Sequence, residues 1–259
     1  MDKTNEVVKD SLIVCTPFGN DTGYVQYFMS CMKLLDECKK QDVKLNFTFK
    51  MGSSLITHSR NEIVNNFIFD SQAENMIFID SDIEFIDSIQ YIIDWVKNKE
   101  YFIAGTYPKK YLDYNNINII INKGYKDFMD IEKIALDYTC ANNDSHNIKV
   151  KDKKVILDRV GTGFMFLSRK LLNDMIERQS EFPDFYNFKK YYRQENKEKI
   201  GYTFFDTMLL DGNPIGEDFS FCERLNFLDI DVLVEPHIKL NHIGTHSYKG
   251  ELVKKFDIQ

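Results

Sequence analysis

Two aspartates directly follow a short apolar run, at Asp80 and Asp82 with Ser81 between them. The run at 76–79 has the composition of a buried strand in a parallel sheet. In open α/β sheets ligands bind at the carboxyl edge of the strands, so both carboxylates are expected to face an open site. Carboxylates this close repel unless protons or a cation intervene, and a hard divalent metal prefers oxygen ligands. An acidic turn without a metal is the alternative that this stretch leaves open.

Two of the five histidines fall within five residues, at His242 and His246. A lone histidine is more often a satisfied polar group than a ligand. Beside an Asp-x-Asp site, however, a neutral imidazole nitrogen is a favoured metal ligand. We therefore predict that at least one of the two histidines completes a metal site with Asp80 and Asp82.

Two adjacent acids, Glu217 and Asp218, begin a predicted helix directly after Gly216. The helix dipole stabilises acids in a first turn, which is a sufficient structural reason for them. A carboxylate at an open site also serves as a general base, and the sequence permits both explanations. Upstream, two glycines bracket a turn in Gly161-Thr162-Gly163, where the backbone can approach a ligand closely.

Arg60 lies near the predicted start of a helix, because Ser59 and Glu62 fit the capping-box pattern. A cation in the first turn opposes the helix dipole. An anionic ligand at the helix N-terminus, such as a diphosphate, would account for its presence. An ion pair with Glu62 or Asp70 is the alternative explanation.

The elements that must position these residues alternate between strand and helix. Apolar runs predict strands at 11–15, 43–49, 75–79 and 101–105, and helical periodicity predicts helices at 24–39, from 59 onwards and at 88–96. This order is typical of a parallel sheet with crossover helices. After a weaker region at 111–154, the pattern predicts strands at 155–160, 164–167 and 230–236, with a helix at 169–176 capped by Ser168. An aromatic insertion at 182–205 carries three tyrosines that either stack on a sugar or pack internally: Tyr186, Tyr191 and Tyr192.

Composition places the chain among ordinary globular α/β proteins. Its 259 residues, 43% hydrophobic and 28% charged, fit one domain over 1–259. A net charge of −7 argues against nucleic acid or an anionic membrane as the main partner. No apolar run reaches the 18 or so residues of a membrane span, and residues 1–6 lack a signal-peptide core. Five scattered cysteines without a CxxC pair predict reduced thiols, so we expect a cytoplasmic location.

Four motifs occur in a characteristic order: a strand with Asp-x-Asp, Gly-Thr-Gly-Phe, Gly-Glu-Asp-x-x-Phe, and His-Ile-Gly. Together they resemble nucleotide-sugar glycosyltransferases of the GT-A fold, which has a Rossmann-like, mostly parallel sheet flanked by helices. The resemblance covers about residues 11–250 and looks closest to small soluble enzymes of bacteria, phages and large DNA viruses. It implies a nucleotide-binding half at about 11–106 and an acceptor-side half at about 107–259.

The resemblance also implies roles for the donor-binding residues. Thr16 and Pro17 would contact the base or ribose of a UDP-sugar, and Arg60 would lie near the base or diphosphate. Asp80, with Ser81, would lie against the ribose and metal, and Asp82 would bind Mn²⁺ or Mg²⁺ directly. His242 would be the third metal ligand, with His246 as the second choice.

On the acceptor side, the resemblance makes Asp218 the catalytic base and Glu217 the residue that orients the acceptor. Residues Gly161, Thr162 and Gly163 would line the acceptor and donor-sugar site. The activity implied is transfer of a hexose or deoxyhexose to a hydroxyl of a glycan or glycoprotein, with inversion if the base faces away from the leaving group. Two other functions remain open: a Mg²⁺-dependent phosphatase of the haloacid-dehalogenase type, and a sugar-nucleotide-binding module without catalysis. The phosphatase is disfavoured by Glu84, where that family carries Thr or Val.

Overall fold

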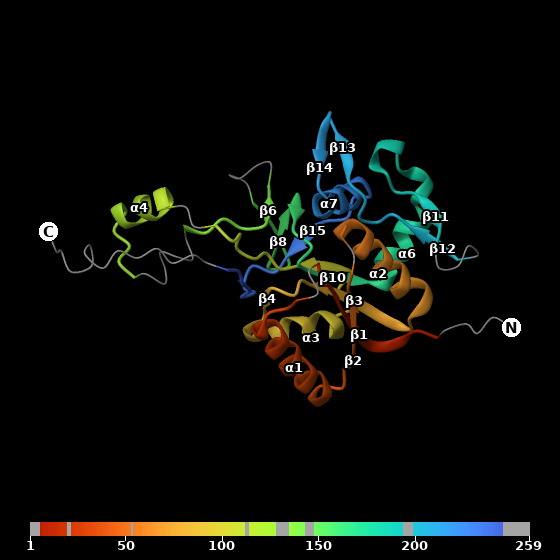
Figure 1. Cartoon of the computed structure of the whole chain (residues 1–259), viewed down its shortest axis with the longest axis horizontal. Helices are drawn as coiled ribbons and strands as arrows, with labels where there is room; N and C mark the ends of the chain where they lie inside the picture. The colour runs from red at the N-terminus through yellow and green to blue at the C-terminus, as the bar shows by residue number, and fades with distance from the viewer. Residues whose placement is uncertain are drawn as a thin grey trace.

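The computed structural model describes residues 6–19, 22–52, 54–111, 114–127, 135–142, 148–193 and 199–245. Its first hundred residues alternate between strands and helices, as predicted (Figure 1). The elements are β1 (Val8–Pro17), α1 (Val25–Lys40), β2 (Lys44–Lys50), α2 (Ile56–Asp70), β3 (Ala73–Ile79), β4 (Ile83–Glu84), α3 (Ile89–Lys97) and β5 (Phe102–Ala104). Helix α1 and strands β2 and β3 match their predicted positions to within a few residues.

An eight-stranded sheet forms the centre of the fold, with the strand order β2-β1-β3-β10-β5-β15-β8-β7. Strands β1, β2 and β3 pair in parallel, and β15 (Val232–Val234) is parallel to β5. Strand β10 (Phe164–Ser168) runs antiparallel between β3 and β5. A hairpin of β7 (Lys149–Lys151) and β8 (Lys154–Leu157) completes the sheet. The predicted fold class, an α/β protein with a mostly parallel sheet flanked by helices, is confirmed.

The remaining elements are short or lie outside the central sheet. They are α4 (Tyr114–Asn122), β6 (Cys140–Ala141), β9 (Arg159–Val160), α6 (Arg169–Glu177), β11 (Lys190–Tyr192), β12 (Ile200–Tyr202), β13 (Met208–Leu210), β14 (Asn213–Ile215), α7 (Glu217–Phe227) and β16 (Asn241–His242), with 3-10 helices η1 (Ile86–Ser88), η2 (Gln179–Glu181) and η3 (Asp184–Tyr186). In the part of the chain that the structure describes, no helix combines the length and apolar character needed to cross a membrane.

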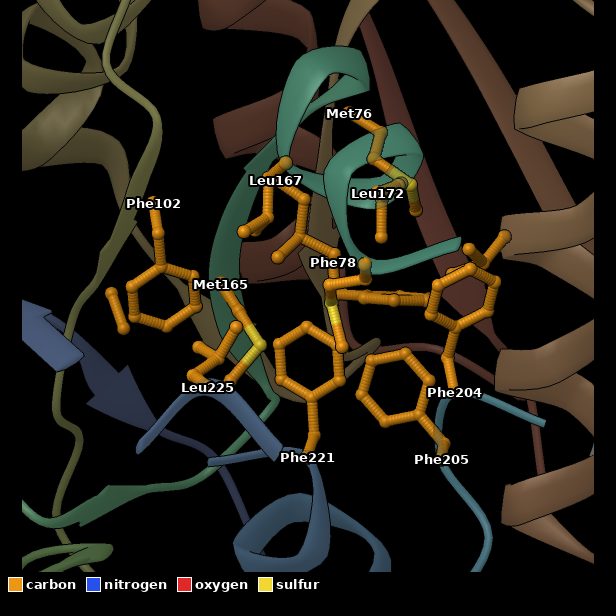
Figure 2. Packing of buried hydrophobic residues seen from close by; sticks show 14 of the residues in the cluster. Met76, Phe78, Phe102, Met165, Leu167, Leu172, Phe204, Phe205, Phe221 and Leu225 are labelled. Atoms are coloured by element: carbon orange, nitrogen blue, oxygen red, sulfur yellow. The ribbon is translucent and has the colours of Figure 1, made fainter. Parts of the chain in front are cut away.

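The apolar core lies on both faces of the sheet, because successive residues of a strand point to opposite faces. On one face Met165 and Leu167 of β10 pack beside Phe78 and Phe221, as Figure 2 shows. On the other face Phe164 and Phe166 join residues of α1 and α3. Phe221 of α7 stacks on Phe205 with ring centroids 4.6 Å apart. This contact fixes α7 against the core and therefore fixes the position of the acids at its start.

The start of α2 differs from the prediction. The helix begins at Ile56, with Leu55 as N-cap and no side-chain cap, so the predicted capping box of Ser59 and Glu62 is wrong. Ser59 is buried, and its N–H donates to the Leu55 carbonyl at 3.2 Å, so it already lies within the helix. Arg60 consequently lies beyond the first turn. The predicted cap of α6 is confirmed, because Ser168 Oγ accepts from the Leu171 N–H at 3.1 Å.

The aromatic insertion packs against the body of the protein. Asn65 of α2, fully buried, accepts from the Tyr202 N–H at 2.7 Å and donates to the Tyr202 carbonyl at 2.9 Å. Tyr186 packs on Phe227 with ring centroids 4.9 Å apart. Tyr191 contacts Gly201 of the neighbouring strand, and Tyr192 is 70% exposed. Internal packing therefore accounts for Tyr186 and Tyr191.

Candidate functional site

Polar side chains from five segments, together with the backbone of the turn before β10, gather at the carboxyl edge of β3. Strand β10 enters the sheet at this edge, since Phe164 pairs with Ile79 at the end of β3. The loops that follow β3 and β5 therefore lie beside the turn that precedes β10. The group contains Arg60 of α2, Asp80 and Asp82 after β3, Tyr107 and Lys110 after β5, Gly163 before β10, Glu217 and Asp218 of α7, and His242 of β16.

Arg60 is the buried cation at the centre of this group. Its Nη2 donates to Asp80 Oδ1 at 2.9 Å, its Nε lies 3.8 Å from Glu217 Oε1, and its guanidinium lies 5.0 Å from the Phe78 ring centroid. Within the described residues, Nε and Nη1 have no hydrogen-bond partner. Burial lowers the pKa of Arg60, but Asp80 and Glu217 outweigh burial and raise it overall.

The alternative explanation of Arg60, an ion pair with Glu62 or Asp70, is wrong. Glu62 instead pairs with Lys50 at 2.6 Å, and Asp70 accepts from Arg193 at 2.9 Å. Arg60 is therefore directed towards the acids at the sheet edge and away from those of its own helix. A buried arginine with two unpaired nitrogen donors is costly unless a further acceptor arrives. Anionic ligand oxygens are such acceptors.

The glycine turn lies between Asp80 and Tyr107 and is hydrogen-bonded to both. The Asp80 N–H donates to the Gly163 carbonyl at 3.0 Å, and the Gly163 N–H donates to Tyr107 Oη at 3.0 Å. A β-carbon on Gly163 would lie 2.4 Å from Tyr107 Oη and 2.8 Å from Asp80 Oδ2, and one on Gly161 would lie 2.7 Å from Tyr107 Oη. Thr162 between them is buried. The two glycines are thus required by the close approach of the protein's own tyrosine.

Asp82 faces Lys110 and His242. Lys110 Nζ lies 2.5 Å from Asp82 Oδ2, and His242 Nε2 lies 3.5 Å from the same oxygen. Burial raises the pKa of Asp82, but His242 and Lys110 outweigh it and lower the pKa to about 2. The pairing of β16 with β4 places His242 opposite Ile83, next to Asp82 in the chain.

The other ring nitrogen of His242 determines what Nε2 can do. Nδ1 lies 2.9 Å from the Pro108 carbonyl oxygen, which only accepts, so Nδ1 carries a proton. When both ring nitrogens are protonated, Nε2 donates towards Asp82, and when the ring is neutral Nε2 presents a lone pair there, which suits a cation held between the two groups. Metal-binding histidines commonly donate their other N–H to a carbonyl in this way. Two ligand atoms each about 2.1 Å from one metal lie roughly 3–3.5 Å apart, which matches the separation of Nε2 and Asp82 Oδ2.

The predicted metal ligands are Asp80, Asp82 and a third from His242 or, as the second choice, His246, and this set stays a prediction. Among the residues that the structure describes, no three His, Cys, Asp or Glu side chains are grouped as a metal site. Asp80 is directed to Arg60, so Asp82 and His242 are the pair that fits a cation. His246 lies outside the described residues.

Glu217 and Asp218 form the first turn of α7, with Gly216 as N-cap. Asp218 Oδ1 accepts from the Phe219 N–H at 2.8 Å. Burial raises the pKa of Asp218 against this hydrogen bond and the charge of Arg60, and burial likewise raises the pKa of Glu217 against Arg60. Half-buried carboxylates with raised pKa values are better proton acceptors than those in water.

The residues predicted to hold the nucleotide have structural contacts of their own. Thr16 is fully buried with its Oγ1 2.5 Å from Tyr27 Oη, and Pro17 is also buried. Ser81 Oγ donates to the Thr22 carbonyl at 3.1 Å, which ties the loop after β1 to the Asp-x-Asp turn. Nucleotide contact by Thr16, Pro17 and Ser81 stays a prediction.

Sequence reasoning missed Tyr107, Pro108 and Lys110. They directly follow β5, the next strand of the central sheet along the chain after the one that carries Asp-x-Asp. Because β5 was predicted, the sequence could have placed these residues at the same edge of the sheet. Their contacts with Gly163, His242 and Asp82 depend on β10 and β16, which are distant in sequence.

The sequence matches no family model and no curated protein at a significant level. Structural similarity was found to A197 from STIV, with 15% identity, a TM-score of 0.42, and coverage of 93% of this chain and 98% of that chain. A second similar structure is a glycosyltransferase involved in the glycosylation of the major capsid of PBCV-1, with 12% identity, a TM-score of 0.29, and coverage of 73% and 72%. These similarities are too distant to assign a function.

Proposed function

We propose that this chain is a metal-dependent glycosyltransferase that moves a hexose or deoxyhexose from a UDP-sugar to a hydroxyl of a glycan or glycoprotein. One observation carries the proposal: a buried, partly unpaired arginine, an Asp–His pair and two half-buried acids meet at a single sheet edge. A sugar–diphosphate donor needs cationic groups for the leaving diphosphate, and an acceptor hydroxyl needs a base. The order of motifs in the sequence supports the same activity.

Charge balance favours a divalent cation at this site. Four carboxylates (Asp80, Asp82, Glu217 and Asp218) face two permanent cations, Arg60 and Lys110, which leaves a net of minus two when all are ionised. Asp82 and His242 would hold Mn²⁺ or Mg²⁺ once Lys110, whose side chain is 38% exposed, moves off Asp82. When bound, such an ion supplies Lewis-acid stabilisation of a diphosphate leaving group.

Three residues of the chain then have separate roles in the proposed transfer. Arg60 offers Nε and Nη1 to donor oxygens while Nη2 keeps Asp80 in place. Asp218 accepts the proton of the attacking hydroxyl, which is typically worth roughly 10²–10⁴-fold in rate. Glu217 orients the acceptor. If Asp218 acts from the face opposite the diphosphate, the anomeric centre inverts.

The test is UDP release from a panel of UDP-sugars with Mn²⁺, with and without EDTA. We expect release from at least one donor, abolished by EDTA. Phosphate release from p-nitrophenyl phosphate without any UDP release would instead identify a phosphatase. Tight UDP-sugar binding without turnover, with or without added glycans, would identify a binding module.

A further inference from the structure

A second pocket of about 480 Å³ lies beside the acids of α7 and has no role in the site described so far. One wall is η3 and the residue after it, and the other is the β13–β14 hairpin, which projects from the body of the protein near the start of α7 (Figure 1). The lining residues include Asp184, Phe185, Asn187, Leu209 and Gly216.

A buried arginine joins the two walls. Arg224 of α7 is fully buried and donates to the carbonyls of Tyr186 at 2.5 Å, Asp206 at 2.6 Å and Phe204 at 2.9 Å. Burial lowers its pKa to about 10. Asn187 adds a bond from Nδ2 to the Thr207 carbonyl at 3.3 Å. The walls are therefore held together from within the core, which preorganises the pocket before any ligand binds.

The lining combines an aromatic ring with a few polar groups. Phe185 is 51% exposed and Leu209 61% exposed, so both present apolar surface to a ligand. Asn187 and the exposed carboxylate of Asp184 provide hydrogen-bonding groups at the η3 end. Asp184 is the only charged side chain among the lining residues, and it pairs with Lys189 at 2.8 Å. A neutral molecule with one apolar face and several hydroxyls fits this surface, whereas an anion does not.

The pocket reaches the proposed catalytic base through Gly216. Gly216 lines the pocket and is the N-cap of α7, two residues before Asp218. A β-carbon on Gly216 would lie 3.2 Å from Asp218 Oδ1, so that carboxylate lies close to the glycine at the edge of the pocket. A sugar seated in the pocket can therefore extend a hydroxyl towards Asp218.

We propose that this pocket is the acceptor subsite and that it takes a neutral sugar residue, with its apolar face on Phe185 and its hydroxyls towards Asp184 and Asn187. The assignment rests on the proposed glycosyltransferase function. In the transfer, the acceptor oxygen forms a bond to the anomeric carbon and passes its proton to Asp218. The bond from that carbon to the phosphate oxygen breaks, and its electron pair leaves with the diphosphate.

Saturation-transfer NMR with methyl β-D-glycosides tests the subsite without UDP, metal or turnover. The neutral probes are the glucoside, galactoside, mannoside and xyloside, and methyl β-D-glucuronide is the charged counterpart of the first. We expect signal from at least one neutral glycoside and none from the glucuronide. The signal should fall at least threefold in Phe185→Ala and in Leu209→Asp. Tyr192→Ala, another exposed aromatic residue outside the pocket, should keep it.

Three results would overturn the subsite: no binding of any neutral glycoside, equal binding by the Phe185→Ala variant, or equal binding of the glucuronide. Because Phe185 and Leu209 are exposed, both variants are expected to fold, and their thermal unfolding is checked against the parent protein. If no glycoside binds but UDP is released in a metal-dependent way, only the subsite proposal is rejected. If a glycoside binds but no UDP is released, only the proposed transfer is rejected.

Discussion

Gly163 shows how strongly a single position depends on its neighbours. Its backbone φ is not in the left-handed region, so alanine is allowed by the backbone but not by the space around it. We predict that Gly163→Ala displaces the Tyr107 hydroxyl or Asp80 and destabilises the protein by about 1–3 kcal/mol, as overpacking does. Urea unfolding measures this. Gly19→Ala, which meets nothing within 4 Å, is the control and should change stability by less than about 0.5 kcal/mol.

Asp218 is the residue on which the proposed chemistry depends most. Asp218→Asn keeps the oxygen that accepts the Phe219 N–H, so the start of α7 should be preserved. Turnover should fall by at least about 10²-fold, because the general base is lost, while the Kd for UDP stays nearly constant. Steady-state kinetics and calorimetric titration of UDP provide the two measurements. A parallel loss of turnover and UDP binding would make Asp218 a structural residue.

The same substitution should make stability less dependent on pH. Burial raises the pKa of Asp218 in the folded state, so the folded protein binds this proton more tightly than the unfolded chain. The contribution of Asp218 to stability therefore declines as pH rises from the unfolded pKa of about 3.9 through the raised folded pKa. Asp218→Asn removes this decline, so its Tm relative to the parent should be higher at pH 8 than at pH 4.5. Calorimetry at both pH values checks it, and an unchanged difference would contradict the raised pKa.

At the scale of elements, α2 aligns Arg60 by docking on the end of β12 and the segment that follows it. Asn65 binds both backbone groups of Tyr202, and Asn61 accepts from the Phe205 N–H at 2.8 Å. Asn65→Ala would leave two backbone groups unpaired in a buried place, which should cost roughly 2–4 kcal/mol in unfolding free energy. Asn226→Ala is the matched control, because Asn226 is exposed and makes one bond, to the Asp158 carbonyl. Similar losses in both variants would show that Asn65 has no special role.

The elements themselves were largely predictable, and the contacts between them were not. Apolar runs and helical spacing are local properties, which is why β1, α1, β3 and α6 occur where the sequence indicates. The start of α2 was misplaced because a capping pattern is a weak local signal that the rest of the fold overrode. Which acid meets which cation depends on the antiparallel insertion of β10 between β3 and β5, a non-local pairing. Asp80 with Arg60 and Asp82 with Lys110 could not be assigned without it.

At the scale of the whole molecule, part of the net negative charge is concentrated at the candidate site. The chain carries a net charge of −7, and the site contributes four carboxylates against two permanent cations. Lys110 now occupies the position beside Asp82 that a metal would take. A metal that binds the folded protein therefore competes with Lys110 and relieves the excess negative charge at the same time.

Metal binding to the folded protein can be measured as an increase in the free energy of unfolding. Mn²⁺ at 100 times its Kd should raise the unfolding free energy by about 2.7 kcal/mol, because it binds the folded state. We predict that Asp82→Ala and His242→Ala lose this gain, while Asp36→Ala on the exposed face of α1 keeps it. Lys110→Met should lower the Kd for Mn²⁺, since it removes the competing ammonium group from Asp82. Thermal unfolding over a Mn²⁺ titration, with EDTA as reference, measures all four variants.

An equal gain in the Asp82→Ala protein would place the metal elsewhere. A weaker affinity in Lys110→Met would make Lys110 a partner of the bound metal site and not its competitor.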